Sequence, residues 1–290
     1  RTERKVSEGH TGFDWKADAN VTLEQDLARR DLTVNAMARA PDGQLIDPFG
    51  GAKDLRQGLL RHVSDAFMED PLRVYRVARF AALLPDFHVA QETSEIMAAM
   101  AASGELSALS AERVWQEWVK AMNAPATGRF FQILDDSRAM SPWFTEVDVK
   151  RVHWVFTRGS YRNDIESNGS LGWVHEIEVI EALMDRLKAP RHHRTTARVI
   201  AEVGPVLADF CGGHPDTLLD ALTIAGAFRS EEAMEHVFGV VEVCAERSCD
   251  RLRELVAELR TMNLGETNVE GAEYGRLLRC ARINHIADCL

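Results

Sequence analysis

The spacing of apolar residues changes near residue 85. From there to residue 290, apolar side chains recur three and four positions apart, the spacing that places them on one face of an α-helix. The pattern therefore predicts an all-helical body, whose tryptophans and phenylalanines are expected in its core rather than on a surface that stacks bases. Representative runs are Val114, Trp115, Trp118 and Val119, and later Leu252, Leu255, Val256 and Leu259.

Before residue 85 the pattern is mixed. Thr22 and Gln25 match a capping box, so a helix or helix pair is expected over residues 22–38. Residues 41–43 (Pro-Asp-Gly) predict a turn, residues 44–46 a short strand, and residues 47–51 the end of that strand. A helix through Leu55, Leu59 and Leu60 is expected to follow.

Residues 69–80 hold a row of charged side chains within a helical pattern. Asp70 suits the N-cap and the following proline suits the first helical position. Asp70, Arg73, Arg76 and Arg79 follow at steps of three, and each step turns the position by roughly 60° around the helix. Taken alone, this row fits two interpretations equally: solvated ion pairs, or one acceptor followed by bidentate donors that recognise a ligand.

Composition narrows the class of protein. The 290 residues are 46% hydrophobic, enough for a sizeable core, and no apolar run reaches the length of a membrane span. The five cysteines are scattered without a Cys-x-x-Cys pair, which indicates reduced thiols and a cytoplasmic protein. The net charge of −11 disfavours a general nucleic-acid binder, and we expect no DNA partner and no membrane partner.

The charge is unevenly distributed along the chain. Residues 1–80 hold 13 basic and 13 acidic residues, so the whole acidic excess lies in residues 81–290. Arginine clusters in the balanced N-terminal part can therefore still meet a polyanion. The chain opens without methionine inside a charged stretch, and we expect that an N-terminal piece precedes it.

Three motifs stand in order along this N-terminal part. The first is Arg-Arg-Asp at residues 29–31, four positions before Asn35, and the second is Asp-Pro-Phe-Gly-Gly at residues 47–51. The third is Glu-Asp-x-x-Arg at residues 69–73. Together they resemble the bacterial class II tRNA nucleotidyltransferases, the CCA-adding enzymes and their poly(A) polymerase relatives. Residues 110–115, where Ser110 is expected to cap a helix with Arg113 in its first turn, look like the neck segment of that family.

The resemblance is strong over residues 1–120 and rests on helical pattern beyond them. It implies a mainly α fold: the C-terminal remainder of an α/β nucleotidyltransferase head (residues 1–62), a helical neck (63–122), and an all-α body and tail that bind tRNA (123–290). The implied activity is the addition of CCA to the tRNA 3′ end from CTP and ATP. Residues 4–20 match the position of the flexible loop of this family.

The resemblance also assigns roles to residues. Asp70 and Arg73 would select the base, because cytosine and adenine each present an amine beside a ring-nitrogen acceptor. A carboxylate accepts from the amine and a guanidinium donates to the ring nitrogen, whereas uracil and guanine invert this pattern. The resemblance further implies that Arg30, Arg76 and Arg79 contact the triphosphate and nucleotide. It implies that Asp31 and Asn35 contact the ribose or shape the site.

Two departures from the family pattern limit these expectations. The Asp-x-Asp that holds Mg²⁺ in this family does not occur in the chain, so no catalytic residue is assigned and Mg²⁺ would be bound through residues outside this sequence. No His-Asp dipeptide occurs either, so no phosphohydrolase activity is expected. Three alternatives stay open: a poly(A) polymerase, a truncated nucleotide- or RNA-binding remnant without transfer activity, and a structural helical protein with chance motifs.

Overall fold

The computed structural model describes residues 2–5, 13–16, 21–265 and 270–290 of the chain. Contacts divide the chain into two compact units. Unit 1 comprises residues 1–157 and 183–189, and unit 2 comprises residues 158–182 and 190–290. The fold is mainly α, as predicted, with short strands before residue 90. The expected domain boundaries after residues 62 and 122 both lie inside unit 1 and remain predictions.

Three two-stranded sheets occur among the described residues, all in unit 1. Strands β1 and β2 pair antiparallel, as do β3 and β4, which form the hairpin predicted from the turn at residues 41–43. Strands β5 and β6 pair in parallel. Their bounds are β1 Thr2–Lys5, β2 Phe13–Lys16, β3 Ala38–Arg39, β4 Leu45–Ile46, β5 Leu59–Leu60 and β6 His88–Val89.

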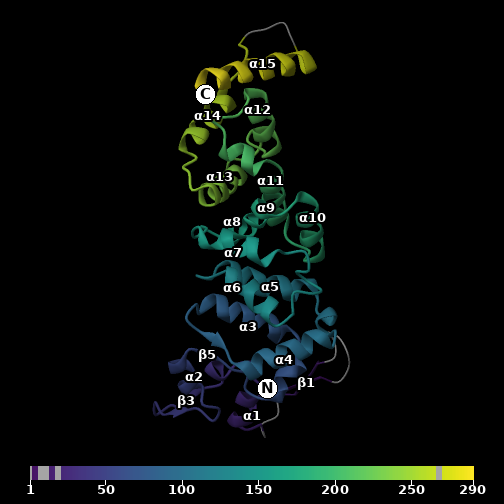
Figure 1. The fold of residues 1–290 in the computed structure, drawn as a ribbon, viewed down its shortest axis with the longest axis vertical. Coiled ribbons are helices and arrows are strands. Elements are labelled where there is room, and N and C mark those ends of the chain that lie inside the picture. The colour runs from purple at the N-terminus through teal and green to yellow at the C-terminus, as the bar shows by residue number, and fades with distance from the viewer. Residues whose placement is uncertain (1, 6–12, 17–20, 266–269) are drawn as a thin grey trace. The chain divides into compact units, whose positions relative to one another are not determined.

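The helices of unit 1 are short, and α3 lies at their centre. It packs against α5 and α6, and α6 packs against α7 (Figure 1). The bounds are α1 Leu23–Ala28, α2 Gly51–Gln57, α3 Leu72–Leu83, α4 Gln91–Ala102, α5 Ala111–Met122, α6 Gly128–Asp136 and α7 Val149–Thr157, with 3₁₀ turns η1 Thr33–Asn35, η2 Asp65–Glu69 and η3 Glu105–Ala108.

The core of this unit is aromatic. The Trp118 ring is fully buried, and its centroid lies 5.2 Å from that of Phe130 and 4.8 Å from that of Phe131. Phe144 closes the same cluster, with its centroid 6.2 Å from that of Trp118. These rings confirm the predicted core role, although Trp154 on α7 is 43% exposed.

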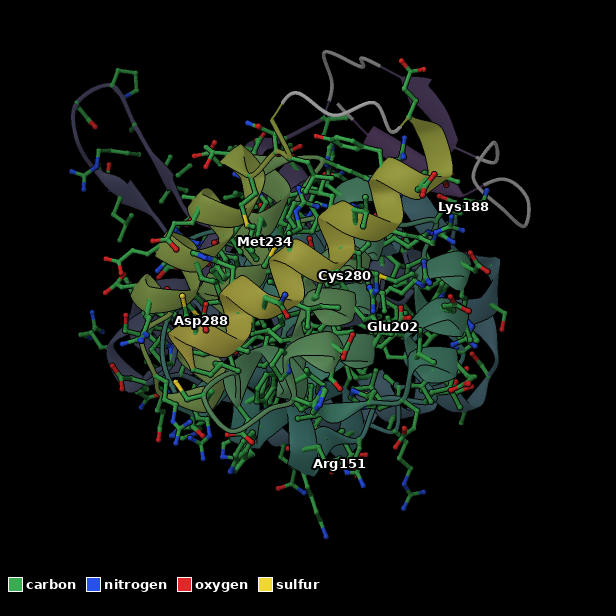
Figure 2. All side chains as sticks on the ribbon, turned by 90° about the horizontal axis from the view of Figure 1, so that it is seen from above. Arg151, Lys188, Glu202, Met234, Cys280 and Asp288 are labelled. Atoms are coloured by element: carbon green, nitrogen blue, oxygen red, sulfur yellow. The ribbon has the colours of Figure 1, made fainter. Side chains whose placement is uncertain are left out.

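Unit 2 is organised around α11, which packs against α8, α9, α12 and α13. Helix α15 packs against α12 and α14. Figure 2 shows α15 along its length, with Cys280 and Asp288 labelled on it. The bounds are α8 Asp164–Gly169, α9 Leu171–Val174, α11 Arg191–Ala208, α12 Pro215–Ile224, α13 Glu231–Ala245, α14 Asp250–Thr261 and α15 Gly271–Cys289, while α10 Ile177–Arg186 has residues in both units.

Two local expectations differ from the structure, and the first difference has a clear cause. The helix expected through Leu59 and Leu60 ends at Gln57, because Gly58 adopts a left-handed conformation (φ 65°) that terminates α2. Leu59 and Leu60 instead form β5. The helix or helix pair expected over residues 22–38 is present only as α1, which begins with the predicted capping box at Thr22 and Gln25 and ends at Ala28, and as the short 3₁₀ turn η1.

Two further expectations concern a flexible loop and membrane-spanning helices. Most of the flexible loop expected at residues 4–20 lies outside the described residues. In the described part of the chain, every helix is too short or too polar to cross a membrane.

Candidate functional site

One face of α3 carries the charged row singled out in the sequence. Val74, Val77, Ala78 and Ala81 are fully buried, so the opposite face of α3 holds Arg73, Arg76 and Arg79. The helix is assigned from Leu72, one residue later than expected, yet the Asp70 carboxylate still accepts a hydrogen bond from the Leu72 backbone N–H at 3.1 Å.

Asp70 is held between two elements. Its Oδ1 accepts from the start of α3, and its Oδ2 accepts from the Arg113 guanidinium of α5 at 2.7 Å. The Asp70 and Arg113 side chains remain 21% and 27% exposed, so a ligand can reach the pair from solvent. A carboxylate has about four lone-pair sites, so Asp70 retains acceptor capacity beside these two contacts.

Arg73 points back toward the preceding segments. Its guanidinium donates to the carbonyl oxygens of Ala66 at 2.5 Å and Arg29 at 2.6 Å. Burial lowers the pKa of Arg73 from its ordinary value, while the carboxylates of Asp70, Asp31 and Glu69 act in the opposite direction. Two of its five donors serve the two carbonyls, which orients the fork and leaves further N–H groups for a ligand.

Arg76 joins the Arg-Arg-Asp segment to α3. Its Nε donates to Asp31 Oδ2 at 2.8 Å, and its terminal nitrogen lies 2.6 Å from the same oxygen. Asp31 Oδ1 accepts from the backbone N–H of Leu32 at 2.9 Å and from the Asn35 amide at 3.3 Å. Burial favours a higher pKa for Asp31, but the Arg76 charge and these hydrogen bonds outweigh it and hold the pKa below its ordinary value.

Arg79 lies one turn further along α3 and is mostly buried. Its Nε donates to Glu117 Oε2 of α5 at 2.6 Å, and its guanidinium lies 3.9 Å from the centre of the Phe80 ring. Lys120 pairs with the other oxygen of Glu117 at 2.9 Å. This arrangement fixes the packing of α3 on α5.

Arg30 lies apart from these contacts. Its side chain is half exposed and pairs with Asp26 of α1 at 3.2 Å, at i,i+4 spacing. The neighbouring Arg29 pairs with Glu69 at 3.1 Å. The structure therefore brings Asp31, Asn35 and Arg76 into one cluster, holds Asp70 and Arg73 at the start of α3, and leaves Arg30 and Arg79 in separate ion pairs.

The contact between Arg113 and Asp70 is not evident from the sequence pattern. There, Arg113 has no role beyond the first turn of a helix, and Ser110 does cap that helix by accepting from the Arg113 backbone N–H at 3.4 Å. One feature of the sequence could have indicated this contact: Arg113 and Glu117 are charged residues four positions apart on a helix whose other positions are largely apolar. Arg113 pairs with Asp70, which precedes α3, and Glu117 pairs with Arg79 on α3.

The described residues do not form a magnesium site at α3. In the parts of the chain that the structure describes, no three carboxylate, imidazole or thiol groups converge there. The carboxylates of Asp31, Asp70 and Glu117 are each occupied by an arginine. These side chains therefore form no group of three converging ligands for Mg²⁺.

Two known family models match segments on either side of the charged row of α3. A family model described as "Poly A polymerase head domain" matches residues 2–61, and one described as "Probable RNA and SrmB-binding site of polymerase A" matches residues 86–150. A solved CCA-adding enzyme with ATP superposes with a TM-score of 0.64 at 18% identity, covering 91% of this chain and 68% of that one. The Thermotoga maritima CCA-adding enzyme complexed with tRNA superposes with a TM-score of 0.60 at 21% identity, covering 91% and 70%.

Curated relatives are similar in sequence over half of the chain or more. A "Multifunctional CCA protein" of Herminiimonas arsenicoxydans is 54% identical over 149 residues, 51% of this chain and 36% of that protein. The "CCA-adding enzyme" of Coxiella burnetii (strain RSA 331 / Henzerling II) is 32% identical over 295 residues, 99% of this chain and 78% of that protein. This chain therefore belongs to the CCA-adding enzyme family within the class II nucleotidyltransferases.

Proposed function

We propose that this protein takes part in adding C, C and A to the 3′ end of tRNA from CTP and ATP. The tRNA 3′ hydroxyl attacks the α-phosphate of the nucleotide, and pyrophosphate leaves. The observation that carries the proposal is the pair at the start of α3, where the Asp70 carboxylate and the Arg73 guanidinium are oriented by protein contacts yet keep hydrogen-bonding capacity. Family membership over almost the whole chain supports it.

Asp70 and Arg73 act as a protein template for the base. Asp70 accepts from the exocyclic amine of cytosine or adenine, and Arg73 donates to the adjacent ring nitrogen. Uracil and guanine place a carbonyl where the amine stands, so the carboxylate meets an oxygen and loses its partner. A buried polar group left unpaired costs about 1–3 kcal/mol, enough to separate the two classes of nucleotide.

Arg113 is a positioning residue for this template. Its guanidinium holds Asp70 Oδ2 at 2.7 Å, while the Leu72 N–H holds Oδ1, so the carboxylate is fixed from two directions. Arg73 is fixed in the same way by two carbonyl oxygens. Groups oriented before the ligand arrives lose less conformational entropy on binding, which favours discrimination between bases.

The other site residues support the nucleotide around this template. Arg76, held by Asp31, contacts the triphosphate while Asp31 and Asn35 shape the ribose side of the site. Arg30, half exposed on α1, contributes charge to the triphosphate. Arg79 acts on the nucleotide through the position of α5, because its guanidinium is taken up by Glu117.

Magnesium chemistry is expected for this family, and the described residues do not fit it. Two-metal transfer needs carboxylates that hold the metal ions at the attacking oxygen and the triphosphate. The carboxylates at α3 are paired with arginines instead. We therefore assign these residues to nucleotide selection and no step to a metal.

The poly(A) polymerase alternative has one observation in its favour, the match of residues 2–61 to the poly(A) polymerase head domain. Incubation of the protein with a tRNA that ends before CCA, together with ATP, CTP and Mg²⁺, separates the candidates by product sequence. Three ordered additions support the proposal. A long tail of A contradicts it and supports the alternative, and selective binding of CTP and ATP without any extension supports a nucleotide-binding remnant.

A further inference from the structure

Three metal-binding side chains converge in unit 2, far along the chain from α3. We call Glu258 of α14 with His285 and Cys289 of α15 the α14–α15 cluster. The His285 Nε2 lies 2.7 Å from Glu258 Oε2 and 3.8 Å from Cys289 Sγ. One ligand atom from each residue lies within 4.8 Å of the others. It is the one such group among the described residues.

The geometry favours a metal over a nucleophilic thiol. In a Cys–His–acid relay, the thiol contacts one imidazole nitrogen and the carboxylate contacts the other. Here the thiol and the carboxylate both approach Nε2 of His285. A metal ion requires ligand atoms that converge on one point, and the ligand atoms of Glu258, His285 and Cys289 do so. For a tetrahedral zinc ion the expected N···S separation is about 3.5 Å and the N···O separation about 3.3 Å, so small side-chain rotations suffice.

The donor set selects the class of metal. Imidazole and thiolate suit zinc, cobalt and similar transition metals, while Mg²⁺ and Ca²⁺ prefer oxygen ligands. A thiolate and a carboxylate carry two negative charges, which balance a divalent ion. A cavity of about 120 Å³ borders Glu258 and Cys289 and is also lined by Arg251, Glu254 and Leu255, so a water molecule has room to take the fourth position.

Helix α15 packs against α12 and α14 with little apolar burial, and two backbone carbonyl contacts, Arg251 to Cys289 O and Arg282 to Leu259 O, already join it to α14. Of its nineteen residues, all of which the structure describes, Ile286 is the one that is buried. Two exposed ion pairs from Arg279 to Asp216 and Asp220 add little stability in water. His285 and Cys289 share one face of the helix at i,i+4 spacing, beside Ile286. A metal ion at this point would fasten the C-terminal turn of α15 to α14.

We propose that Glu258, His285 and Cys289 bind a divalent transition-metal ion of the zinc class, which fastens α15 to α14. Binding releases the Cys289 thiol proton to solvent as the sulfur–metal bond forms, and it replaces the His285–Glu258 hydrogen bond with two bonds to the metal. Before binding, Nε2 of His285 donates its proton to Glu258; on binding, that proton leaves Nε2 and the ring takes up a proton on Nδ1 by exchange with solvent, so that the Nε2 lone pair faces the metal. The site is independent of nucleotide selection at α3.

The test titrates the tag-free, metal-stripped full chain with Zn²⁺ and with Co²⁺ in excess Mg²⁺. We expect one ion per chain, a thiolate-to-cobalt charge-transfer band, and a rise in the melting temperature on binding. His285→Ala and Cys289→Ser should each weaken binding at least ~10-fold and abolish the band. Cys280→Ser is the matched control, since Cys280 is an exposed thiol on the same helix outside the cluster (Figure 2).

Protection of the unaltered protein against alkylation gives a second measurement that needs no variant. Zn²⁺ should slow alkylation of Cys289, as located by mass spectrometry, and leave that of Cys280 unchanged. No binding by the unaltered chain, undiminished binding by Cys289→Ser, or equal loss in Cys280→Ser would each overturn the proposal.

Discussion

The ion pair between Asp31 and Arg76 is predicted to be a main link between the Arg-Arg-Asp segment and α3. Asp31 is 5% exposed and Arg76 is 34% exposed, and two guanidinium nitrogens lie 2.8 and 2.6 Å from one carboxylate oxygen. Asp31→Asn keeps the shape of the side chain and removes its charge. Arg76→Met removes the other charge and keeps an apolar stem of similar length.

The expected coupling lies between two known limits. Exposed ion pairs contribute about 0–1 kcal/mol, whereas removing one partner of a buried pair costs about 3–5 kcal/mol. With one buried and one partly exposed member, we expect each single variant to lose about 2–3 kcal/mol of stability. The double variant should lose less than the sum, with a coupling energy of about 1.5–2.5 kcal/mol.

Urea unfolding followed by tryptophan fluorescence measures this coupling. Trp173 is the one tryptophan in the sequence outside unit 1, so the signal reports mainly the unit that holds the pair. A coupling energy below about 0.5 kcal/mol would refute the structural link, because distant independent sites add within that margin. Binding of all four nucleoside triphosphates should weaken alike in Asp31→Asn, since Asp31 and Arg76 are proposed to act on the ribose and triphosphate that the four share.

The pH dependence of the coupling has a definite sign. The pKa of Asp31 is lowered in the folded protein from its ordinary value of 3.8. The stabilisation is therefore fully present above the unfolded-state pKa and is lost as the pH falls through the lower folded-state pKa. The coupling should be equal at pH 7 and about pH 5.5, and should decline only below about pH 4.

Three further predictions test the fold and the site. Arg113→Ala should weaken CTP and ATP binding several-fold by freeing Asp70, with partial recovery in Arg113→Lys; unchanged affinity in a nucleotide titration would remove Arg113 from the site. Gly172→Ala should destabilise unit 2 by more than about 2 kcal/mol in thermal unfolding, because a Cβ there would lie 2.1 Å from the Ala197 carbonyl oxygen. Gly275→Ala, whose Cβ would meet nothing within 4 Å, should instead stabilise α15 by up to about 1 kcal/mol. Trp118→Ala should cost about 3–5 kcal/mol and the exposed Trp154→Ala clearly less, as measured by circular dichroism.

Local signals in the sequence predicted the local structure well. The capping box at Thr22 and the Pro-Asp-Gly turn before β4 each depend on residues close together in the chain, and both are confirmed. The error at Leu59 and Leu60 has the same origin. Their apolar spacing suits either a helix or a buried strand, and the left-handed conformation at Gly58 and the partner strand β6, which lies beyond α3, decide between them.

The partners of the charged row could not be predicted in this way. Asp70 meets Arg113 across 43 positions of sequence, and Arg76 meets Asp31 across 45. Spacing along one helix predicts a row of charges around part of its surface, but only the packing of α3 against α5 and the Arg-Arg-Asp segment shows which charges meet. The motifs therefore predicted the residues of the candidate site, and the fold shows which partners these residues contact.

The most direct test of the account is equilibrium binding of CTP, ATP, UTP and GTP to the unaltered chain and to Asp70→Ala. The unaltered chain should prefer CTP and ATP, and Asp70→Ala should reduce that preference at least ~10-fold, equivalent to about 1.4 kcal/mol. Arg30→Ala, the matched control, should weaken all four nucleotides alike. An unaltered chain that binds all four equally, or an Asp70→Ala variant that keeps the preference, would contradict selection of the base by Asp70 and Arg73.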